Sequence, residues 1–241
     1  MAIETSTPGL SVAALYEGVV YSETSVPNQN GDRPFSLPEL ARLVLDRIPR
    51  QPDLAAKPAV QRVIIGGGPG SFTGIRSGIA YALGLVSDQY IDLYPSLLSL
   101  LVDNDKICSG VGLQRAGRGE LFQLTITELH GTGERATYRA VLASEPKTVS
   151  EVLAWVRNNE ESLPVFGAWT KGDEVNEPFL TSTIGYQLKE MRADALFAVA
   201  SAVKSQRLVI EGSGNRDRLE PYYVRRVSAR TLSERRGQAN P

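Results

Sequence analysis

The stretch from Gly66 to Gly84, GGGPGSFTGIRSGIAYALG, has the residue types and spacing most suggestive of a ligand-binding site. Glycine-rich turns between a strand and a helix often hold phosphate, because their backbone N–H groups point toward the anion. A P-loop also needs a lysine, and none occurs between Lys57 and Lys106. The dinucleotide fingerprint fails too, because Ser71 or Thr73 stands where its third glycine belongs. Phosphate binding at this turn therefore stays open, without a matching motif.

Other catalytic arrangements find less support in the residue types. The single histidine, His130, cannot supply the pair of histidine ligands that many catalytic metal sites use. A kinase needs a carboxylate base and magnesium-binding aspartates, but Val63–Leu85 contains no acid and Glu4 stands alone in the opening turn. The G-x-S-x-G pattern of serine hydrolases fails around Ser71, because Thr73 occupies its last position.

The glycines within the expected helix have a second interpretation, in packing. Each interior glycine destabilises a helix by about 1 kcal/mol relative to alanine, so a close contact must need the missing side chains. At about 100° per residue, Gly74 and Gly78 fall on a stripe of mostly small residues beside an apolar stripe. The apolar stripe suits a sheet, and the small stripe suits a closely packed helix. That helix belongs either to this chain, within Leu37–Ile48, or to another subunit.

The apolar stripe comprises Phe72, Ile75, Ile79, Leu83 and Val86, and the small stripe comprises Gly74, Gly78, Tyr81, Ala82 and Leu85.

Composition limits the class of protein around this stretch. The chain has 241 residues, 42% hydrophobic and 22% charged, which is typical of a globular protein with a sizeable core. Its formal net charge of −1 does not indicate nucleic acid or an anionic membrane as a partner. The lone cysteine, Cys108, the absence of a secretory-type start and the short apolar runs favour a cytoplasmic protein with no membrane span.

Turn signals and hydrophobic periodicity then predict the elements that hold the glycine turn. A capping box at Ser36 and Glu39 marks the start of the first helix. Three strands that meander and then alternate with helices predict a mixed sheet with helix layers. We expect three strands within 1–23, further strands within 60–66, 90–94, 111–129, 136–143 and 163–167, and helices within 35–48, 72–86, 95–102, 150–159 and 194–204.

Three stretches resemble the TsaB family, also called YeaZ. GGGPGSFTGIRSGIAYALGL resembles the family signature G-P-G-S-F-T-G-[LI]-R, IETSTPGLSVAAL resembles its opening, and LEPYYVR resembles its closing P-x-Y-[LV]-R. The order and spacing of the three match the family along the whole chain. The resemblance implies an α/β fold of the actin, Hsp70 and sugar-kinase (ASKHA) type, with two related subdomains of mixed sheets flanked by helices. We expect an N-terminal subdomain at 1–105, a C-terminal subdomain at 106–227 and a polar tail at 228–241.

The resemblance also implies a function. TsaB-like proteins are non-catalytic relatives of TsaD, the subunit that transfers a threonylcarbamoyl group to the adenosine next to the anticodon in tRNAs that read codons beginning with A. The implied partners are a TsaD-like subunit and a TsaE-like ATPase, with a homodimer when the chain is alone and with tRNA bound only through the complex. The chain would hold no cofactor of its own, and whether ATP or ADP binds at the partner interface stays open.

The expected interface lies on the first two helices and the turn before the second. We expect the face with Gly74 and Gly78 to be exposed in the monomer and buried against a partner helix. The expected interface residues are Leu40, Leu43, Val44, Gly70, Ser71, Phe72, Thr73, Gly74, Arg76, Gly78, Tyr81 and Ala82.

The chain departs from the family pattern at Arg115, where many relatives carry aspartate, so the role of that acid is in doubt here. Only Met1–Ile3 precede Glu4, and since the first strand is central in this fold, we expect a few residues upstream. Two alternatives remain: an ATP-dependent small-molecule kinase of the same superfold, and a homodimeric scaffold unrelated to tRNA.

Overall fold

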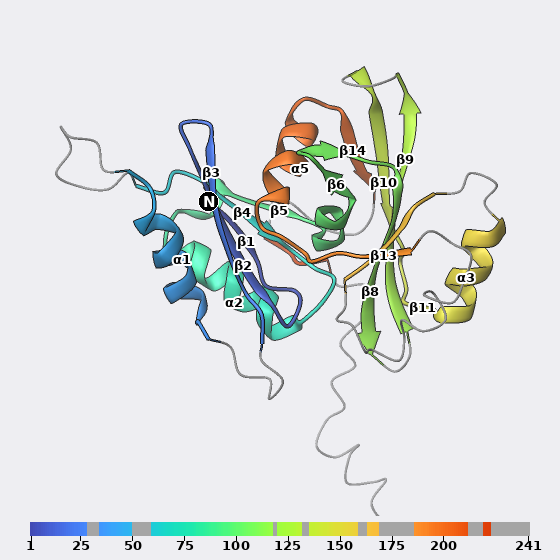
Figure 1. Cartoon of the computed structure of the whole chain (residues 1–241), viewed down its shortest axis with the longest axis horizontal. Helices are drawn as coiled ribbons and strands as arrows, with labels where there is room; N and C mark the ends of the chain where they lie inside the picture. Colours follow the sequence, from blue (N-terminus) through green and yellow to red (C-terminus); the bar gives the residue numbers. More distant parts are fainter. Residues whose placement is uncertain are drawn as a thin grey trace, which may run out of the picture.

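The computed structural model describes residues 1–27, 34–49, 59–117, 120–131, 135–158, 163–168, 186–211 and 219–222. Within them, two large sheets stand side by side, with helices between them and on their outer faces (Figure 1). Among the described residues, no helix combines the length and apolar character needed to cross a bilayer.

The first sheet has the strand order β3-β2-β1-β4-β5. Its central strand, β1, pairs antiparallel with β2 and parallel with β4, as expected for a meander followed by helical crossovers. The predicted mixed sheet is confirmed. Its strands are β1 (Ala2–Glu4), β2 (Leu10–Tyr16), β3 (Val19–Ser25), β4 (Val63–Gly66) and β5 (Ile91–Tyr94).

The second sheet repeats this pattern. Its order β13-β12-β8-β9-β10-β14 contains the series β10-β9-β8-β12-β13, in which the strand directions match those of β3-β2-β1-β4-β5. The chain therefore holds two sheets of related topology. The strands are β8 (Gly110–Gly117), β9 (Glu120–His130), β10 (Thr137–Leu142), β11 (Lys147–Thr148, paired with β9), β12 (Val165–Gly167), β13 (Tyr186–Leu188) and β14 (Leu208–Glu211).

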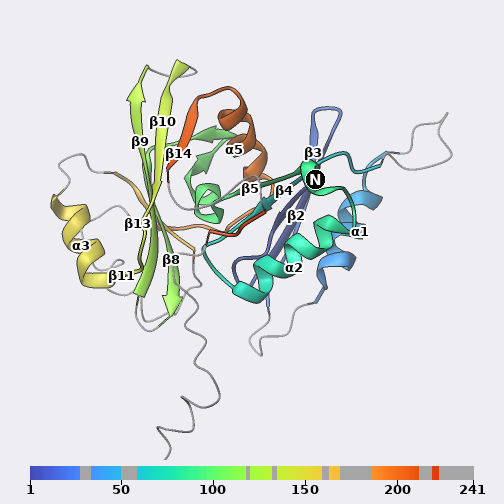
Figure 2. The same ribbon diagram turned by 180° about the vertical axis from the view of Figure 1, so that it is seen from behind.

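Helices cover these sheets in layers. α1 (Leu37–Asp46) and α2 (Phe72–Leu83) lie on one face of the first sheet, and Figure 2 shows them in front of it. α5 (Ala195–Lys204) and the 3-10 helix η2 (Ser96–Leu101) fill the space between the sheets, and α3 (Val149–Asn158) covers the outer face of the second. α5 packs on β4 and β5 although it follows them by about half the chain.

Local signals explain how some of these elements begin. The predicted capping box at α1 is confirmed, because the Glu39 carboxylate accepts hydrogen bonds from the backbone N–H of Ser36 at 2.8 Å and from its hydroxyl at 2.6 Å. The expected helix at 95–102 is instead the 3-10 helix η2, whose residues are all buried. The expected strand at 111–129 is two strands, β8 and β9, which form an antiparallel pair.

The predicted boundary at 105/106 falls between the short strands β6 (Val102–Asp103) and β7 (Lys106–Ile107), which pair as a hairpin. One main apolar core joins both sheets through α5 and η2. The division into subdomains at this residue stays a prediction.

Candidate functional site

The glycine turn connects β4 to α2 at the junction of the two sheets. Its residues from Gly67 to Pro69 are buried, and Gly68 has a φ of +96°, which disfavours any residue with a side chain. Ser71 caps α2, since its Oγ accepts a hydrogen bond from the N–H of Gly74 at 3.1 Å. The turn and the helix start that the signature predicts are confirmed.

Three backbone N–H groups of this turn donate hydrogen bonds within the chain. Gly67 donates to the carbonyl oxygen of Tyr94 at 2.7 Å, and Gly68 donates to Ser96 Oγ at 3.0 Å. Ser71 N–H donates to the carbonyl oxygen of Ser6 at 2.6 Å. A phosphate cradle requires such groups to point outward at the anion. These three groups are therefore not available to an anion.

The missing side chains make room for the opening strand and its neighbours. A Cβ at Gly66 would overlap the carboxylate of Glu4, and one at Gly70 would overlap the carbonyl oxygen of Ser6. Gln114, from β8 in the second sheet, donates through Nε2 to the same Ser6 oxygen at 3.2 Å. The glycines thus let β1, the turn and β8 meet.

Glu4 lies in this junction with its side chain almost fully buried, at 1% exposure. Burial raises the pKa of its carboxyl above the ordinary 4.5, and hydrogen bonds from Ser6 and Ser96 oppose part of this shift. Its Oε1 accepts from the backbone N–H of Ser6 at 2.7 Å. This carboxyl therefore takes up a proton more readily than an exposed glutamate.

The closing stretch also reaches the glycine turn. The backbone N–H of Tyr222 donates to the carbonyl oxygen of Gly67 at 2.8 Å, and the ring, 3% exposed, covers Gly67. Its hydroxyl donates to the carbonyl oxygen of Leu93 at 3.5 Å. Periodicity does not predict this contact, and the only signal was the resemblance of LEPYYVR to the closing motif.

The predicted orientation of Gly74 and Gly78 is wrong. A Cβ at Gly74 would overlap the carbonyl oxygen of Thr5, and one at Gly78 would lie 2.8 Å from Thr5 Oγ1 and 3.7 Å from Ile3 Cγ2. Gly78 is buried and Gly74 half-buried, so these two positions face the end of β1 of the same chain. The physical reason is the close approach of α2 to the central strand, which leaves no room for a Cβ.

The opposite side of α2 faces solvent, and we call it the α2 outer face. Two large apolar side chains of the expected sheet-facing stripe lie on it, Phe72 at 42% exposure and Leu83 at 48%. The Arg76 guanidinium carbon lies 5.1 Å from the centroid of the Phe72 ring, within cation–π range. The face comprises Phe72, Thr73, Arg76, Ser77, Ala80 and Leu83.

The remaining expected interface residues divide by burial. Leu40 and Val44 are fully buried, where α1 packs on β2 and β3, and Ala82 is buried as well, so none of these side chains is exposed as expected. Leu43 and Tyr81 are half-buried. Gly70 is half-buried and Ser71 is exposed beside the α2 outer face.

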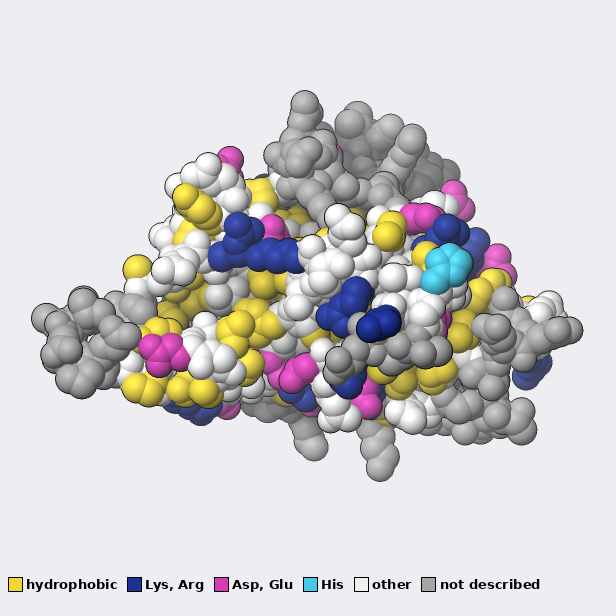
Figure 3. All heavy atoms as spheres, turned by 90° about the horizontal axis from the view of Figure 1, so that it is seen from above, with side chains coloured by type: hydrophobic (Ala, Val, Ile, Leu, Met, Phe, Trp, Pro, Cys, Tyr) yellow, Lys and Arg dark blue, Asp and Glu magenta, His cyan; other side chains and the backbone are white. Residues whose placement is uncertain are grey.

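Two other singled-out residues lie away from this junction. His130 ends β9 and is exposed, and Figure 3 shows the histidine at the surface among side chains of mixed charge. Arg115 is exposed on β8, opposite Leu121 of β9. Within the described ranges, no group of three or more His, Cys, Asp or Glu side chains could hold a metal ion. The tail at 228–241 lies outside the described residues.

Comparison with solved structures identifies similar folds. YeaZ from Pseudomonas aeruginosa matches with a TM-score of 0.57 and 21% identity, over 92% of this chain and 97% of that one. An uncharacterized protein with similarity to peptidase YeaZ from Pseudomonas aeruginosa matches with a TM-score of 0.59 and 21% identity, over 93% of this chain and 98% of that one. No protein-family model matches the sequence, and no curated protein matches it significantly.

Proposed function

We propose, from a fold that resembles YeaZ over nearly its full length, that the chain is a TsaB (YeaZ) type subunit with the ASKHA fold. Its role would be that of a non-catalytic, activating partner of a TsaD-like enzyme, in the complex that forms threonylcarbamoyladenosine next to the anticodon in tRNAs reading codons that begin with A.

The observation that carries this proposal is the meeting of the three stretches that resemble the family. Glu4 and Ser6 from the opening, the glycine turn of the signature and Tyr222 from the closing stretch touch one another between the two sheets. Residues far apart in sequence thus serve one packing function. A shared fold, together with the contact of all three motifs in this chain, supports common membership more strongly than any one motif does.

The partner-binding surface in this proposal is the α2 outer face. Large apolar side chains exposed beside an arginine and small residues are typical of the centre of a protein interface. Phe72 and Leu83 supply the apolar contacts, and Arg76, stacked on Phe72, supplies a charge. We further propose that the same face forms a homodimer when the TsaD-like subunit is absent, and that the complex, not the lone chain, binds tRNA.

Co-expression with the TsaD-like and TsaE-like proteins of the same source tests this proposal. We expect the chain to co-elute with the TsaD-like subunit, and the three proteins to form threonylcarbamoyladenosine on tRNA when ATP and a threonylcarbamoyl donor are supplied. The TsaD-like protein alone should give much less product. Failure to co-elute, together with full activity of the TsaD-like protein without this chain, would contradict the proposal.

A further inference from the structure

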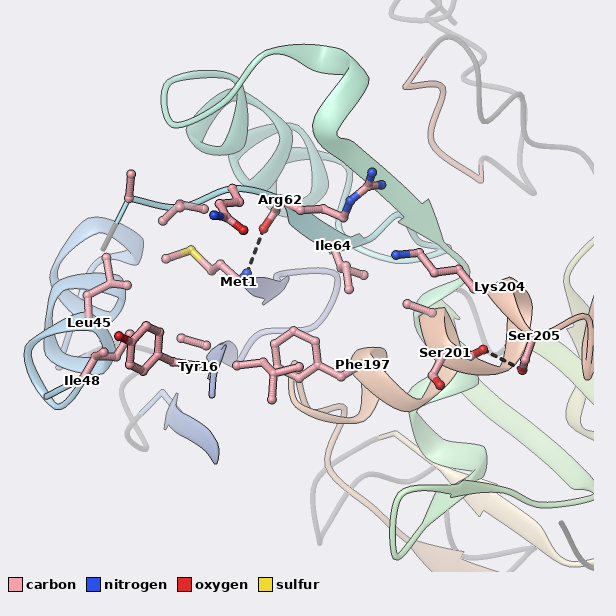
Figure 4. A pocket seen from close by; sticks show the side chains of 16 residues that line it. Met1, Tyr16, Leu45, Ile48, Arg62, Ile64, Phe197, Ser201, Lys204 and Ser205 are labelled. Atoms are coloured by element: carbon pink, nitrogen blue, oxygen red, sulfur yellow. Dashed lines mark hydrogen bonds between the residues drawn. The ribbon is translucent and has the colours of Figure 1, made fainter. Parts of the chain in front are cut away.

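A groove of about 730 Å³ lies at the end of the first sheet where β1 begins. Its walls come from α1, the end of β2, the segment before β4, and α5 (Figure 4). The N-terminal amine of Met1 also lines the groove: it donates to the carbonyl oxygen of Arg62 at 2.8 Å, and burial lowers its pKa from the ordinary 8.0 to about 6. The groove is on a different part of the chain from the α2 outer face. Its size is within the usual range for small-molecule sites.

The two ends of the groove differ in chemistry. Leu45, Ile48 and Tyr16 form an apolar end, and Phe197 lies between that end and the polar one, as Figure 4 shows. Ser201, Lys204 and Ser205 of α5 line the polar end, on the side where Arg62 also points. An occupant that matches both ends must be amphiphilic.

Charge pairing limits the occupant further. Arg62 Nη1 donates to Asp92 Oδ2 at 2.7 Å, so its charge is balanced within the chain. Lys204 is exposed and has no ion-pair partner among the described residues, whereas the Met1 amine, with its lowered pKa, is mostly uncharged at neutral pH. At neutral pH, Lys204 therefore supplies the main unpaired positive charge at the end of an apolar channel, which is complementary to a single negative charge on an apolar body.

We propose that this groove binds a small amphiphilic monoanion, an aliphatic or aryl carboxylate. The carboxylate accepts hydrogen bonds from Lys204 Nζ, and the apolar body lies along Phe197 toward Leu45 and Ile48. The site is hollowed between α1, the sheet and α5, which suits one free molecule and not the surface of a bilayer. A bound ligand would contact α1 and α5 at once and so link the outer helix layer to the helix between the sheets.

Calorimetric titration of the full chain with octanoate and with octan-1-ol, both below the concentration at which they aggregate, tests this proposal. The two ligands share an aliphatic body and differ in head-group charge. We expect octanoate to bind about tenfold more tightly than octan-1-ol, because a charge-assisted hydrogen bond forms at Lys204. In Lys204→Gln this preference should vanish, whereas in Lys106→Gln, at an exposed lysine outside the groove, it should stay.

A second variant tests the location without touching the charge. Ser201→Trp, at an exposed position of the lining, should block both ligands while the thermal unfolding temperature stays within a few degrees. Equal binding of both ligands to the wild type, or octanoate binding that survives Ser201→Trp, would overturn the proposal. So would Lys204-dependent co-sedimentation with phosphatidylglycerol vesicles without octanoate binding, which would indicate a lipid surface.

Discussion

The backbone N–H of Tyr222 donates to the carbonyl oxygen of Gly67 at 2.8 Å, and the Tyr222 ring closes over that glycine. A residue near the end of the described chain is thereby part of the turn that the opening strand also contacts. Two predictions about stability follow from these contacts.

Truncation of Tyr222 should destabilise the junction. Because the ring is 3% exposed, Tyr222→Ala should lower the free energy of unfolding by about 3–5 kcal/mol, as for other buried aromatic truncations. Tyr222→Phe keeps the ring and loses the 3.5 Å contact to the Leu93 carbonyl oxygen, so its effect should be much smaller than that of Tyr222→Ala. Urea denaturation followed by circular dichroism measures both. Equal effects of the two variants would contradict the packing role.

A methyl group on the inner side of α2 should cost stability although alanine favours helices. Gly74→Ala should destabilise by about 3 kcal/mol, because its Cβ meets the backbone carbonyl of Thr5, which cannot move freely. Gly78→Ala should cost less, since its Cβ meets the Thr5 side chain at 2.8 Å. Ser77→Ala, on the α2 outer face, is the control and should stay within about 0.5 kcal/mol. A stabilising Gly74→Ala would show that α2 does not approach β1 closely.

Stability should depend on pH through Glu4. Burial raises the pKa of Glu4 in the folded chain above its ordinary 4.5, so the folded state holds this proton more tightly than the unfolded state. That contribution is fully present below pH 4.5 and is lost as the pH rises through the folded pKa. Glu4→Gln should remove it, so the difference in unfolding free energy between wild type and variant should change with pH in this direction. A difference that is independent of pH above 4.5 would contradict the shift.

Pairing should depend on the α2 outer face. Ala80→Arg places a long charged side chain at an exposed position, so the chain should stay folded while its affinity for the TsaD-like subunit falls at least about thirtyfold, as at interface hot spots. Ala154→Arg, at an exposed position of α3 on the second sheet, is the matched control. Size-exclusion chromatography of the mixed proteins and surface plasmon resonance measure the difference. Full affinity of Ala80→Arg would move the interface elsewhere.

If Gly78 faced outward, Gly78→Arg would leave the isolated chain folded. Because Gly78 faces inward, we expect the opposite. Its side chain would enter the contact between α2 and β1, so the isolated chain should fail to fold. For the same reason this variant cannot report on pairing, and Ala80→Arg takes its place.

Local signals predicted much of the fold, because they act over a few residues. The capping box at Ser36 and the glycine turn before Ser71 are examples. The rotation of α2 was not predictable, because a helical wheel gives the angle between two stripes but not which stripe meets the sheet. Close approach of the Thr5 carbonyl requires glycine on that side and leaves Phe72 and Leu83 exposed.

Hydrophobic periodicity could not predict the long-range contacts either. The bond between Gln114 and Ser6 joins two sheets, and the bond between Tyr222 and Gly67 joins opposite parts of the chain. Neither contact can be recognised from a short window of sequence. Resemblance to a known family pointed to the right stretches, but it did not say that they touch.

The position of α5 has a consequence for biosynthesis. α5 fills the space between the sheets and packs on β4 and β5, yet the ribosome makes it roughly a hundred residues after those strands. A nascent chain can form β1 to β5 with α1 and α2. The apolar inner face of that sheet then stays exposed to solvent until α5 emerges from the exit tunnel. Sheets left open in this way are prone to aggregate. Folding of this protein is therefore completed only after most of the chain has been translated. Slow or truncated synthesis leaves a first sheet whose exposed apolar face is prone to aggregate.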